Sequence, residues 1–238
     1  MSYLYFNEGL DGQTNENSSL NDDGLPYHII GNFRGKLKTF KTYNPQTNLE
    51  NEIVYSEASN IEIEQAAELA AEAFKVFQKV SGTKKSEFLN EIAHEIEALG
   101  DKLIKTYCSE TGLPEGRAMG ERGRTVFQLR SFANLVKEGS WVEAVIDTAD
   151  PNRQPIPKVD IRKMLIPLGP VVVFGASNFP LAYSTAGGDT AAALAAGCPV
   201  IVKAHPAHAR TSELVADAIN KAAISCNMPK GIFAHLHG

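Results

Sequence analysis

The sequence predicts an α/β fold, in which a parallel sheet of the doubly wound class follows a helical segment and a two-stranded ribbon. Residues 168–238 alternate short apolar runs with helical segments in the order strand, helix, strand, helix, strand. This order is typical of one mononucleotide-binding half of a doubly wound sheet. Residues 31–140 are mostly helical by their hydrophobic period, and residues 141–167 change to a period of two.

The composition favours a globular protein that acts on small molecules. The chain has 238 residues, 43% of them hydrophobic, which is enough for one large domain or two small ones. A formal net charge of −5 gives no basic surface for nucleic acid or anionic lipid. No apolar run approaches the roughly 18 to 20 residues of a membrane span, and the chain does not begin with a leader-like segment. We therefore expect a cytoplasmic protein with no nucleic-acid or membrane partner.

The cysteines argue against a disulfide framework and against a metal site. Cys108, Cys198 and Cys226 are odd in number and irregularly spaced. Each lies within or at the end of a predicted helix or strand, where a cysteine is more often a small buried hydrophobe than a reactive thiolate. We expect a reducing compartment and no bound metal.

The first 60 residues predict an extension and a hairpin. Residues 1–30 are rich in Asn, Asp, Ser and Gly and form an N-terminal extension with little apolar periodicity. From Gly31 to Tyr55, short apolar and β-branched runs are interrupted by Asn44-Pro45, which predicts two strands joined by a turn.

Four helices follow. Ser59 and Glu62 have the spacing of a capping box, and apolar residues then recur at helical spacing up to Gly82: Ile63, Ala67, Ala70, Phe74 and Phe77. The second helix ends at Gly100 and places Phe88, Ile92, Ile96 and Leu99 on one face. The third covers about 102–111 before Gly112, and the fourth runs from Pro114 to about Lys137.

Residues 141–147 and 159–166 have the alternation of strands and predict a paired ribbon within 141–167. A polar, exposed ribbon is only marginally stable alone, so packing against another subunit is one way to support it. A strand pair that lies on its own domain is the alternative.

In the last segment, residues 171–174 and 199–204 are short apolar runs, and we expect the first to be buried on both faces of a parallel sheet. Helices are expected over 184–197 and 211–227, and a third strand over 231–238. Ligands of such folds bind beyond the carboxyl ends of the strands, which here means near 175–180 and 203–208.

The loop after the first strand lacks the GxGxxG fingerprint and carries FGASNFP instead. An asparagine side chain at a strand end can donate a hydrogen bond to a carbonyl oxygen that becomes an oxyanion. Asn178 is the candidate for this role. An asparagine before Phe-Pro is, however, more often a turn residue that satisfies local backbone groups.

The loop after the second strand indicates the cofactor. NAD-selective enzymes place an Asp or Glu there for the ribose 2′-hydroxyl, whereas basic residues accommodate the 2′-phosphate of NADP. Here Lys203, His205, His208 and Arg210 occur with no carboxylate before Glu213. The pattern favours NADP, with NAD possible, and a solvated basic loop is the alternative.

At these residues the sequence resembles the aldehyde dehydrogenase superfamily, most closely the branch that oxidises 2,5-dioxovalerate (α-ketoglutarate semialdehyde). The resemblance runs from about Thr39 to Gly238. Its motifs are TYNPQTN, ETGLPEGRAMGERGRT, GASNFPLAYSTAGGDTAAALAAGCPVIVKAHPAH and MPKGIFAHLHG.

The resemblance implies a role for several residues. Asn178 matches the family asparagine that stabilises the oxyanion, and Lys203 matches the lysine that holds the adenosine ribose or its phosphate. Pro206 stands where NAD-preferring relatives carry a glutamate. The backbone of Gly175, Ala176, Ser177 and Asn178 would line the cofactor, and the ribbon would make a homodimer or homotetramer.

The resemblance also implies what this chain lacks. Family members are about twice as long, and their nucleophilic cysteine, general-base glutamate and second glycine-rich motif lie beyond Gly238. We therefore interpret the chain as a truncated, amino-terminal half without the catalytic domain. The substrate would be an aldehyde with a carboxylate, oxidised to an acid such as 2-oxoglutarate.

A carboxylate tail requires a cation, and Arg122 or Arg124 on the fourth helix is a candidate, although pairing of either with Glu121 is the more ordinary explanation. Two rival functions stay open. One is a non-catalytic nucleotide-binding or assembly module, and the other is a related acyl-phosphate reductase.

Overall fold

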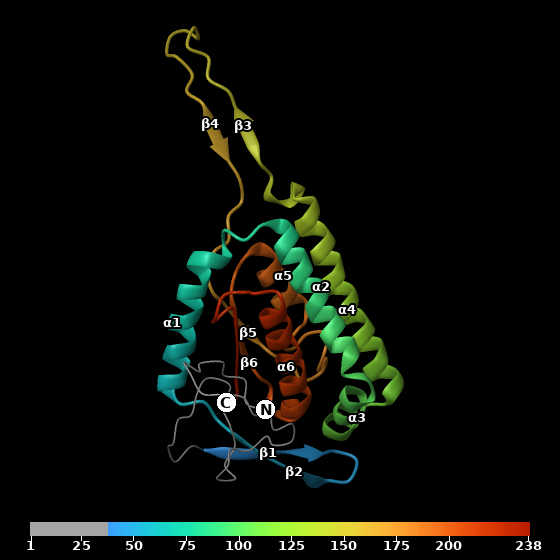
Figure 1. Cartoon of the computed structure of the whole chain (residues 1–238). Helices are drawn as coiled ribbons and strands as arrows, with labels where there is room; N and C mark the ends of the chain where they lie inside the picture. Colours follow the sequence, from blue (N-terminus) through green and yellow to red (C-terminus); the bar gives the residue numbers. More distant parts are fainter. Residues whose placement is uncertain (1–37) are drawn as a thin grey trace.

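The computed structural model describes residues 38–238, which form a parallel sheet with helices on both faces and two antiparallel strand pairs outside it (Figure 1). The predicted extension 1–30 and residues 31–37 lie outside the described part. The elements are β1 Thr39–Asn44, β2 Leu49–Ser56, α1 Asn60–Phe77, α2 Gly82–Ala98, α3 Gly100–Thr111, α4 Glu115–Glu138, η1 Ser140–Val142, β3 Val145–Asp147, β4 Ile161–Lys163, β5 Val171–Phe174, α5 Gly188–Ala196, β6 Val200–Lys203, η2 Pro206–His208, α6 Ala209–Ser225 and β7 Phe233–Leu236.

The central sheet has the order β5-β6-β7, and both neighbouring pairs are parallel. Phe174 is in register with Lys203, and Lys203 with Leu236, so the three carboxyl ends meet at one edge. The predicted strand-helix-strand-helix-strand unit is therefore confirmed. Loops that follow β5 and β6 must lie side by side at this edge.

The two faces of the sheet are covered unequally. The helices α2 to α6 form the main core on one face, and Phe88, Leu129 and Ile219 are fully buried there. On the other face α1 packs through Ala66 and Ala70 on residues of β6 and β7: Ile201, Ala234 and Leu236. Because α1 reaches only these two strands, the same face of β5 lies open.

The expectation that strand 171–174 is buried on both faces is therefore wrong. Val172 is 55% exposed and Phe174 is 73% exposed, whereas Val173 on the opposite side is buried. The central strand β6 does fit the expectation, since Val200, Ile201 and Val202 are all buried.

The first helix begins as predicted and buries part of the predicted face, including Ala70 and Phe77. Ser59 and Glu62 form the capping box, with Glu62 N–H donating to Ser59 Oγ at 3.3 Å. The helix ends at Phe77 rather than near Gly82, and its predicted face is partly wrong because Ile63 is 49% exposed. The buried stripe is made mainly of alanines, which let the helix axis approach the sheet closely.

Helices α2 and α4 pack against each other, and Gly82 shows how closely. A Cβ on Gly82 would lie 2.1 Å from the carbonyl oxygen of Val136, so a side chain at the first residue of α2 would collide with α4.

The predicted stop of α3 is also confirmed, since Gly112 adopts a left-handed conformation with φ of 69°. Pro114 then caps α4 in an extended conformation.

The predicted ribbon is present but shorter than expected. Strands β3 and β4 pair antiparallel over three residues each and project from the body of the molecule (Figure 1). Trp141 and Val142 form a 3-10 turn rather than a strand. The positive φ angles of Gly139 (90°) and Glu143 (50°) on either side of this turn are incompatible with an extended run.

The helix expected from Ser184 begins only at Gly188. Residues 175–187 instead form a loop with successive turns, in which the Gly187 N–H donates to the Ser184 carbonyl at 2.9 Å. This loop separates β5 from α5, and it carries Asn178.

Candidate functional site

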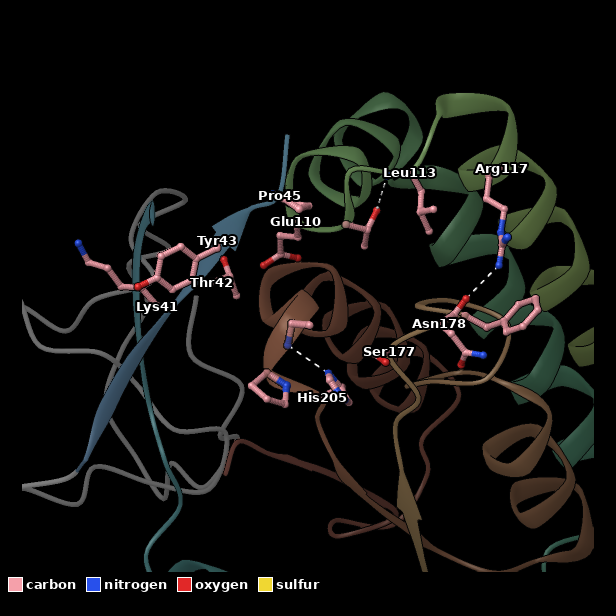
Figure 2. Close-up of a pocket in the computed structure, with 14 residues that line it drawn as sticks. Lys41, Thr42, Tyr43, Pro45, Glu110, Leu113, Arg117, Ser177, Asn178 and His205 are labelled. Carbon is pink, nitrogen blue, oxygen red and sulfur yellow. Dashed lines mark hydrogen bonds between the residues drawn. The ribbon is translucent and has the colours of Figure 1, made fainter. Parts of the chain in front are cut away.

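A cavity of about 940 Å³ lies beyond the carboxyl ends of β5 and β6 (Figure 2). Five segments line it: the hairpin, the end of α3, the start of α4, and the loops after β5 and β6. The lining residues are Lys41, Thr42, Tyr43, Pro45, Glu110, Thr111, Leu113, Arg117, Ser177, Asn178, Phe179, His205, Pro206 and Ala207. Four residues predicted from the sequence thus line one cavity: Ser177, Asn178, His205 and Pro206.

The backbone of Gly175 and Ala176 joins the loop after β5 to its neighbours. The Gly175 N–H donates to the carbonyl of Lys203 at 3.0 Å, and the Ala176 N–H to the carbonyl of Tyr183 at 3.0 Å. A Cβ on Gly175 would lie 2.8 Å from Ser184 Oγ, so only glycine fits without a shift. Gly175 and Ala176 directly precede the lining residue Ser177 in the sequence, but they do not line the cavity themselves.

Asn178 is exposed at the cavity, and its backbone is held by the fourth helix. Arg117 Nη2 donates to the Asn178 carbonyl at 2.9 Å, and the guanidinium carbon lies 4.7 Å from the centre of the Phe179 ring. Figure 2 shows the Asn178 carbonyl directed toward Arg117 and the side-chain amide directed away from it. The amide is therefore free of this contact.

Glu121 lies one turn further along α4 and is 5% exposed. Its Oε1 accepts from Arg117 Nε at 2.9 Å and from the Tyr107 hydroxyl at 2.8 Å. Its Oε2 accepts from the backbone N–H groups of Leu181 at 3.1 Å and Ala182 at 3.4 Å. One buried carboxylate thus links α3, α4 and the loop after β5.

The loop after β6 presents His205 and Pro206 to the cavity. His205 Nδ1 accepts from the Ala207 N–H at 3.1 Å and so caps η2, which fixes the ring at the cavity wall. Burial, followed by the nearby Lys203 ammonium, lowers the pKa of His205. This wall carries an imidazole and an exposed proline, with no carboxylate in residues 203–209.

His208 and Lys203 lie at the edge of the cavity without lining it. His208 is fully buried, stacks on His205 at 5.6 Å, and its Nε2 lies 3.0 Å from the Ala176 carbonyl. This contact favours a structural role that joins the two loops. Lys203 Cε lies 3.9 Å from the position of a Cβ on Gly238, so its side chain runs along the end of β7.

Glu110 is a functional candidate that the sequence did not reveal. It is the penultimate residue of α3, is 5% exposed, and lines the cavity. Its two oxygens accept from the Arg210 N–H, the Thr211 N–H and the Thr211 hydroxyl, all at 2.8 Å. A residue of α3 therefore caps α6 and holds the loop with His205 and Pro206 in place.

The two arginines proposed for a substrate carboxylate do not line the cavity. Arg122 donates to the carbonyl of Gly100 at 3.2 Å, near the junction of α2 and α3. Arg124 is exposed, donates to the Tyr183 hydroxyl at 2.5 Å, and stacks on that ring at 4.8 Å. The alternative that either arginine pairs with Glu121 is wrong, since Arg117 takes that place. The i, i+4 spacing of Arg117 and Glu121 was the available sequence signal.

The cysteines behave as packing residues. Cys198 is buried, and burial raises the pKa of the Cys108 and Cys226 thiols, which disfavours the thiolate. Over residues 38–238 no group of three His, Cys, Asp or Glu side chains could hold a metal ion. Within the same range no helix is long and apolar enough to cross a membrane.

We expect the protein to lose stability when the pH falls below about 6.5, the ordinary pKa of histidine. Burial lowers the pKa of His208, which faces His205 and Glu121, and the pKa of His235, which faces His237 and His208. Both imidazoles are neutral in the folded state and charge more readily in the unfolded one. The stability they contribute is therefore present above pH 6.5 and is lost as the pH falls below it.

Each excluded proton contributes up to about 1.4 kcal/mol of stability per pH unit. Burial raises the pKa of Asp217 to about 8, so its carboxyl is protonated in the folded state below that pH and offsets one of the two histidines. The net slope should therefore be about 1.4 kcal/mol per pH unit. Urea unfolding between pH 5 and 8 measures this slope. Replacement of His235 by Gln should lower this slope by up to about 1.4 kcal/mol per pH unit, and a slope that does not change would contradict the assignment.

The fold is an α/β domain with a parallel sheet, and the cavity lies at the carboxyl ends of its strands, where ligands of such folds bind. A sequence profile described as "Aldehyde dehydrogenase family" matches residues 33–238. This chain belongs to the aldehyde dehydrogenase family.

Alpha-ketoglutaric semialdehyde dehydrogenase 2 of Azospirillum brasilense is 55% identical over 185 residues, which cover 78% of this chain and 35% of that protein. The chain thus spans about a third of the length of the curated relatives it matches.

Solved structures share the fold. A betaine aldehyde dehydrogenase of Staphylococcus aureus in complex with NAD+ has a TM-score of 0.73 and 21% identity, and the match covers 84% of this chain and 38% of that one. A glyceraldehyde-3-phosphate dehydrogenase of Methanocaldococcus jannaschii complexed with NADP has a TM-score of 0.69 and 21% identity, over 86% and 42% of the two chains.

Proposed function

We propose that this chain supplies the cofactor-binding part and the oxyanion donor of an NADP-preferring aldehyde dehydrogenase. The substrate class is an aldehyde that carries a carboxylate, with 2,5-dioxovalerate oxidised to 2-oxoglutarate as the first candidate. One observation carries the proposal. Asn178 follows β5, Pro206 follows β6, and both line the same cavity at the carboxyl edge of the sheet.

Asn178 has the chemistry that the reaction requires of this chain. When a nucleophile adds to an aldehyde carbonyl, the oxygen becomes an oxyanion, and the Asn178 amide N–H can donate a hydrogen bond to it. The nucleophile and the general base belong to parts of the protein outside this chain. When bound, NADP would accept the hydride, and the loops after β5 and β6 would hold and orient it.

The composition of the loop after β6 supports NADP. The loop after β6 offers Lys203 and His205 and contains no carboxylate that would repel a 2′-phosphate. At position 206 the resemblance places a glutamate in NAD-preferring proteins, and here an exposed proline stands at the cavity wall. These features of the loop after β6 support the preference for NADP.

We expect Pro206→Glu to reverse the cofactor preference. A carboxylate at this wall would repel the 2′-phosphate and could accept from the ribose hydroxyls of NAD. The ratio of kcat/KM for NADP to that for NAD should fall by roughly 100-fold, on the order of the several kcal/mol that opposed like charges cost. The assay uses a catalytically competent protein that contains this chain, with 2,5-dioxovalerate as substrate.

Pro206→Ala is the matched control, because it removes the proline without adding charge and should leave the ratio almost unchanged. Equal ratios in both variants would contradict the NADP assignment. Binding of NADP without turnover of any aldehyde by the full protein that contains this chain would instead support the non-catalytic module, and turnover only of acyl phosphates would support the reductase.

The substrate carboxylate and the second subunit are further parts of the proposal. Of the two arginines, Arg124 is the better placed, because it contacts Tyr183 of the loop that carries Asn178, whereas Arg122 engages the backbone of Gly100.

The projecting ribbon has apolar side chains more than half exposed, among them Ile146 and Ile161. We infer that it packs on a second copy in a homodimer or homotetramer, and a monomeric mass in solution would contradict this.

A further inference from the structure

The loop that carries Asn178 is held by an ion pair on α4 that takes no part in the sheet. Residues 175–187 form turns between β5 and α5, so their backbone groups lack the regular partners of a helix or strand. Leu181 and Ala182 are buried, so their N–H groups must find other partners, because an unpaired buried N–H costs about 1–3 kcal/mol. Arg117 and Glu121 provide partners at two places along this loop.

The first place is Asn178 itself. The Arg117 guanidinium donates to the Asn178 carbonyl at 2.9 Å and lies over the next side chain, Phe179, at 4.7 Å. The carbonyl and the side chain of Asn178 branch from the same Cα. Fixing the carbonyl on the side of α4 therefore holds the Cα and the start of the side chain in place, and Figure 2 shows the amide pointing away from Arg117.

The second place lies three residues further on. The Glu121 carboxylate accepts from the backbone N–H groups of Leu181 and Ala182, which begin the return of the loop toward α5. The same carboxylate accepts from Arg117 Nε at 2.9 Å and from the Tyr107 hydroxyl at 2.8 Å. Glu121 thus orients the arginine and anchors the loop at once, and Tyr107 of α3 keeps the carboxylate itself in place.

Burial explains why this arrangement is specific. Glu121 is 5% exposed and Tyr107 is fully buried, so the carboxylate cannot exchange its protein partners for water. A buried charge is tolerated only when it is paired and hydrogen-bonded, and each oxygen of Glu121 accepts from two donors. Residues 178–182 of the loop are therefore tied to the helical layer.

We propose that Arg117 and Glu121 are positioning residues, which act through Asn178 by fixing the backbone of residues 178–182. This inference rests on the proposed role of Asn178 as oxyanion donor. A donor that is aimed before the reaction stabilises the oxyanion without reorganisation, and a misplacement of about 1 Å can lower a rate by roughly 100-fold.

The test is a double-mutant cycle in a catalytically competent protein that contains this chain. We expect Arg117→Ala to lower kcat by roughly 10- to 100-fold with little change in the KM for NADP. In a background of Asn178→Ala, the same change should have almost no further effect, because the donor that it positions is absent. Arg117→Lys keeps the charge but loses the forked geometry, so its kcat should lie between that of the unsubstituted protein and that of Arg117→Ala.

Two further variants complete the design. Glu121→Gln retains an oxygen for the loop amides but loses the ion pair, so it should lower kcat less than Arg117→Ala does. Arg130→Ala is the matched control, because Arg130 lies on the same helix and pairs with Glu97 at 2.6 Å, away from the loop. It should leave kcat unchanged.

The outcomes separate this inference from the proposed function. If Asn178→Ala lowers kcat and the Arg117 variants do not, the positioning role falls and the oxyanion role stands. If Arg117→Ala lowers kcat equally in both backgrounds, its role is structural and the inference is wrong. If Asn178→Ala leaves kcat unchanged, the proposed function and the inference fall together.

Discussion

Replacement of Asn178 by Ala should lower kcat by about 100- to 1,000-fold while the affinity for NADP changes little. The amide is exposed at the carboxyl edge of the sheet, and its backbone is already held by Arg117, so the substitution removes the donor and leaves the loop in place. Loss of one oxyanion donor typically costs about 2.7–4 kcal/mol in the barrier. Pre-steady-state measurement of hydride transfer, together with NADP binding followed by fluorescence, separates the two effects.

Asn178→Asp is the shape-matched companion to this variant. It keeps the size of the side chain, replaces the N–H donor by an oxygen, and places negative charge beside the oxyanion. The loss in kcat should therefore equal or exceed that of the alanine variant. Equal losses in kcat and in NADP affinity, or a fully active Asn178→Asp, would contradict the oxyanion role.

The order of elements was predictable because each depends on local chemistry. The capping box at Ser59, the left-handed stop at Gly112 and the apolar run 199–204 each act within a few residues. It was harder to predict which face of a helix or strand is buried, because that depends on elements distant in the sequence. Ile63 has helical spacing but is exposed, and Phe174 ends an apolar strand but faces away from the core, because α1 covers only β6 and β7.

The site was predictable where it follows the topology. Parallel strands bring their carboxyl ends to one edge, so Asn178 and Pro206 could be expected to meet. The side chains that hold the loops of Asn178 and Pro206 in place could not be predicted, because they come from distant positions in the sequence. Glu121 bonds amides 60 and 61 residues away, and Glu110 bonds residues 100 and 101 positions away. No spacing rule along the chain connects such pairs.

Replacement of Glu110 by Ala should lower the free energy of unfolding by about 3 kcal/mol or more. The helix α6 begins at Ala209, and the N–H groups of its first turn have no partner within the helix. Glu110 accepts from two of them, those of Arg210 and Thr211, and also from the Thr211 hydroxyl. Its removal leaves buried donors unpaired, at about 1–3 kcal/mol each, and takes negative charge from the positive end of the helix dipole.

Urea unfolding measures the loss as a lower midpoint at constant slope. Glu97→Ala is the control, because Glu97 makes an exposed ion pair with Arg130 and such pairs contribute about 1 kcal/mol or less. A loss for Glu110→Ala no larger than that of the control would contradict the capping role. Since α6 follows directly on the loop with His205 and Pro206, the same variant should also weaken NADP binding, whereas the control should not. A carboxylate from α3 would then set both the start of α6 and the shape of the cavity wall.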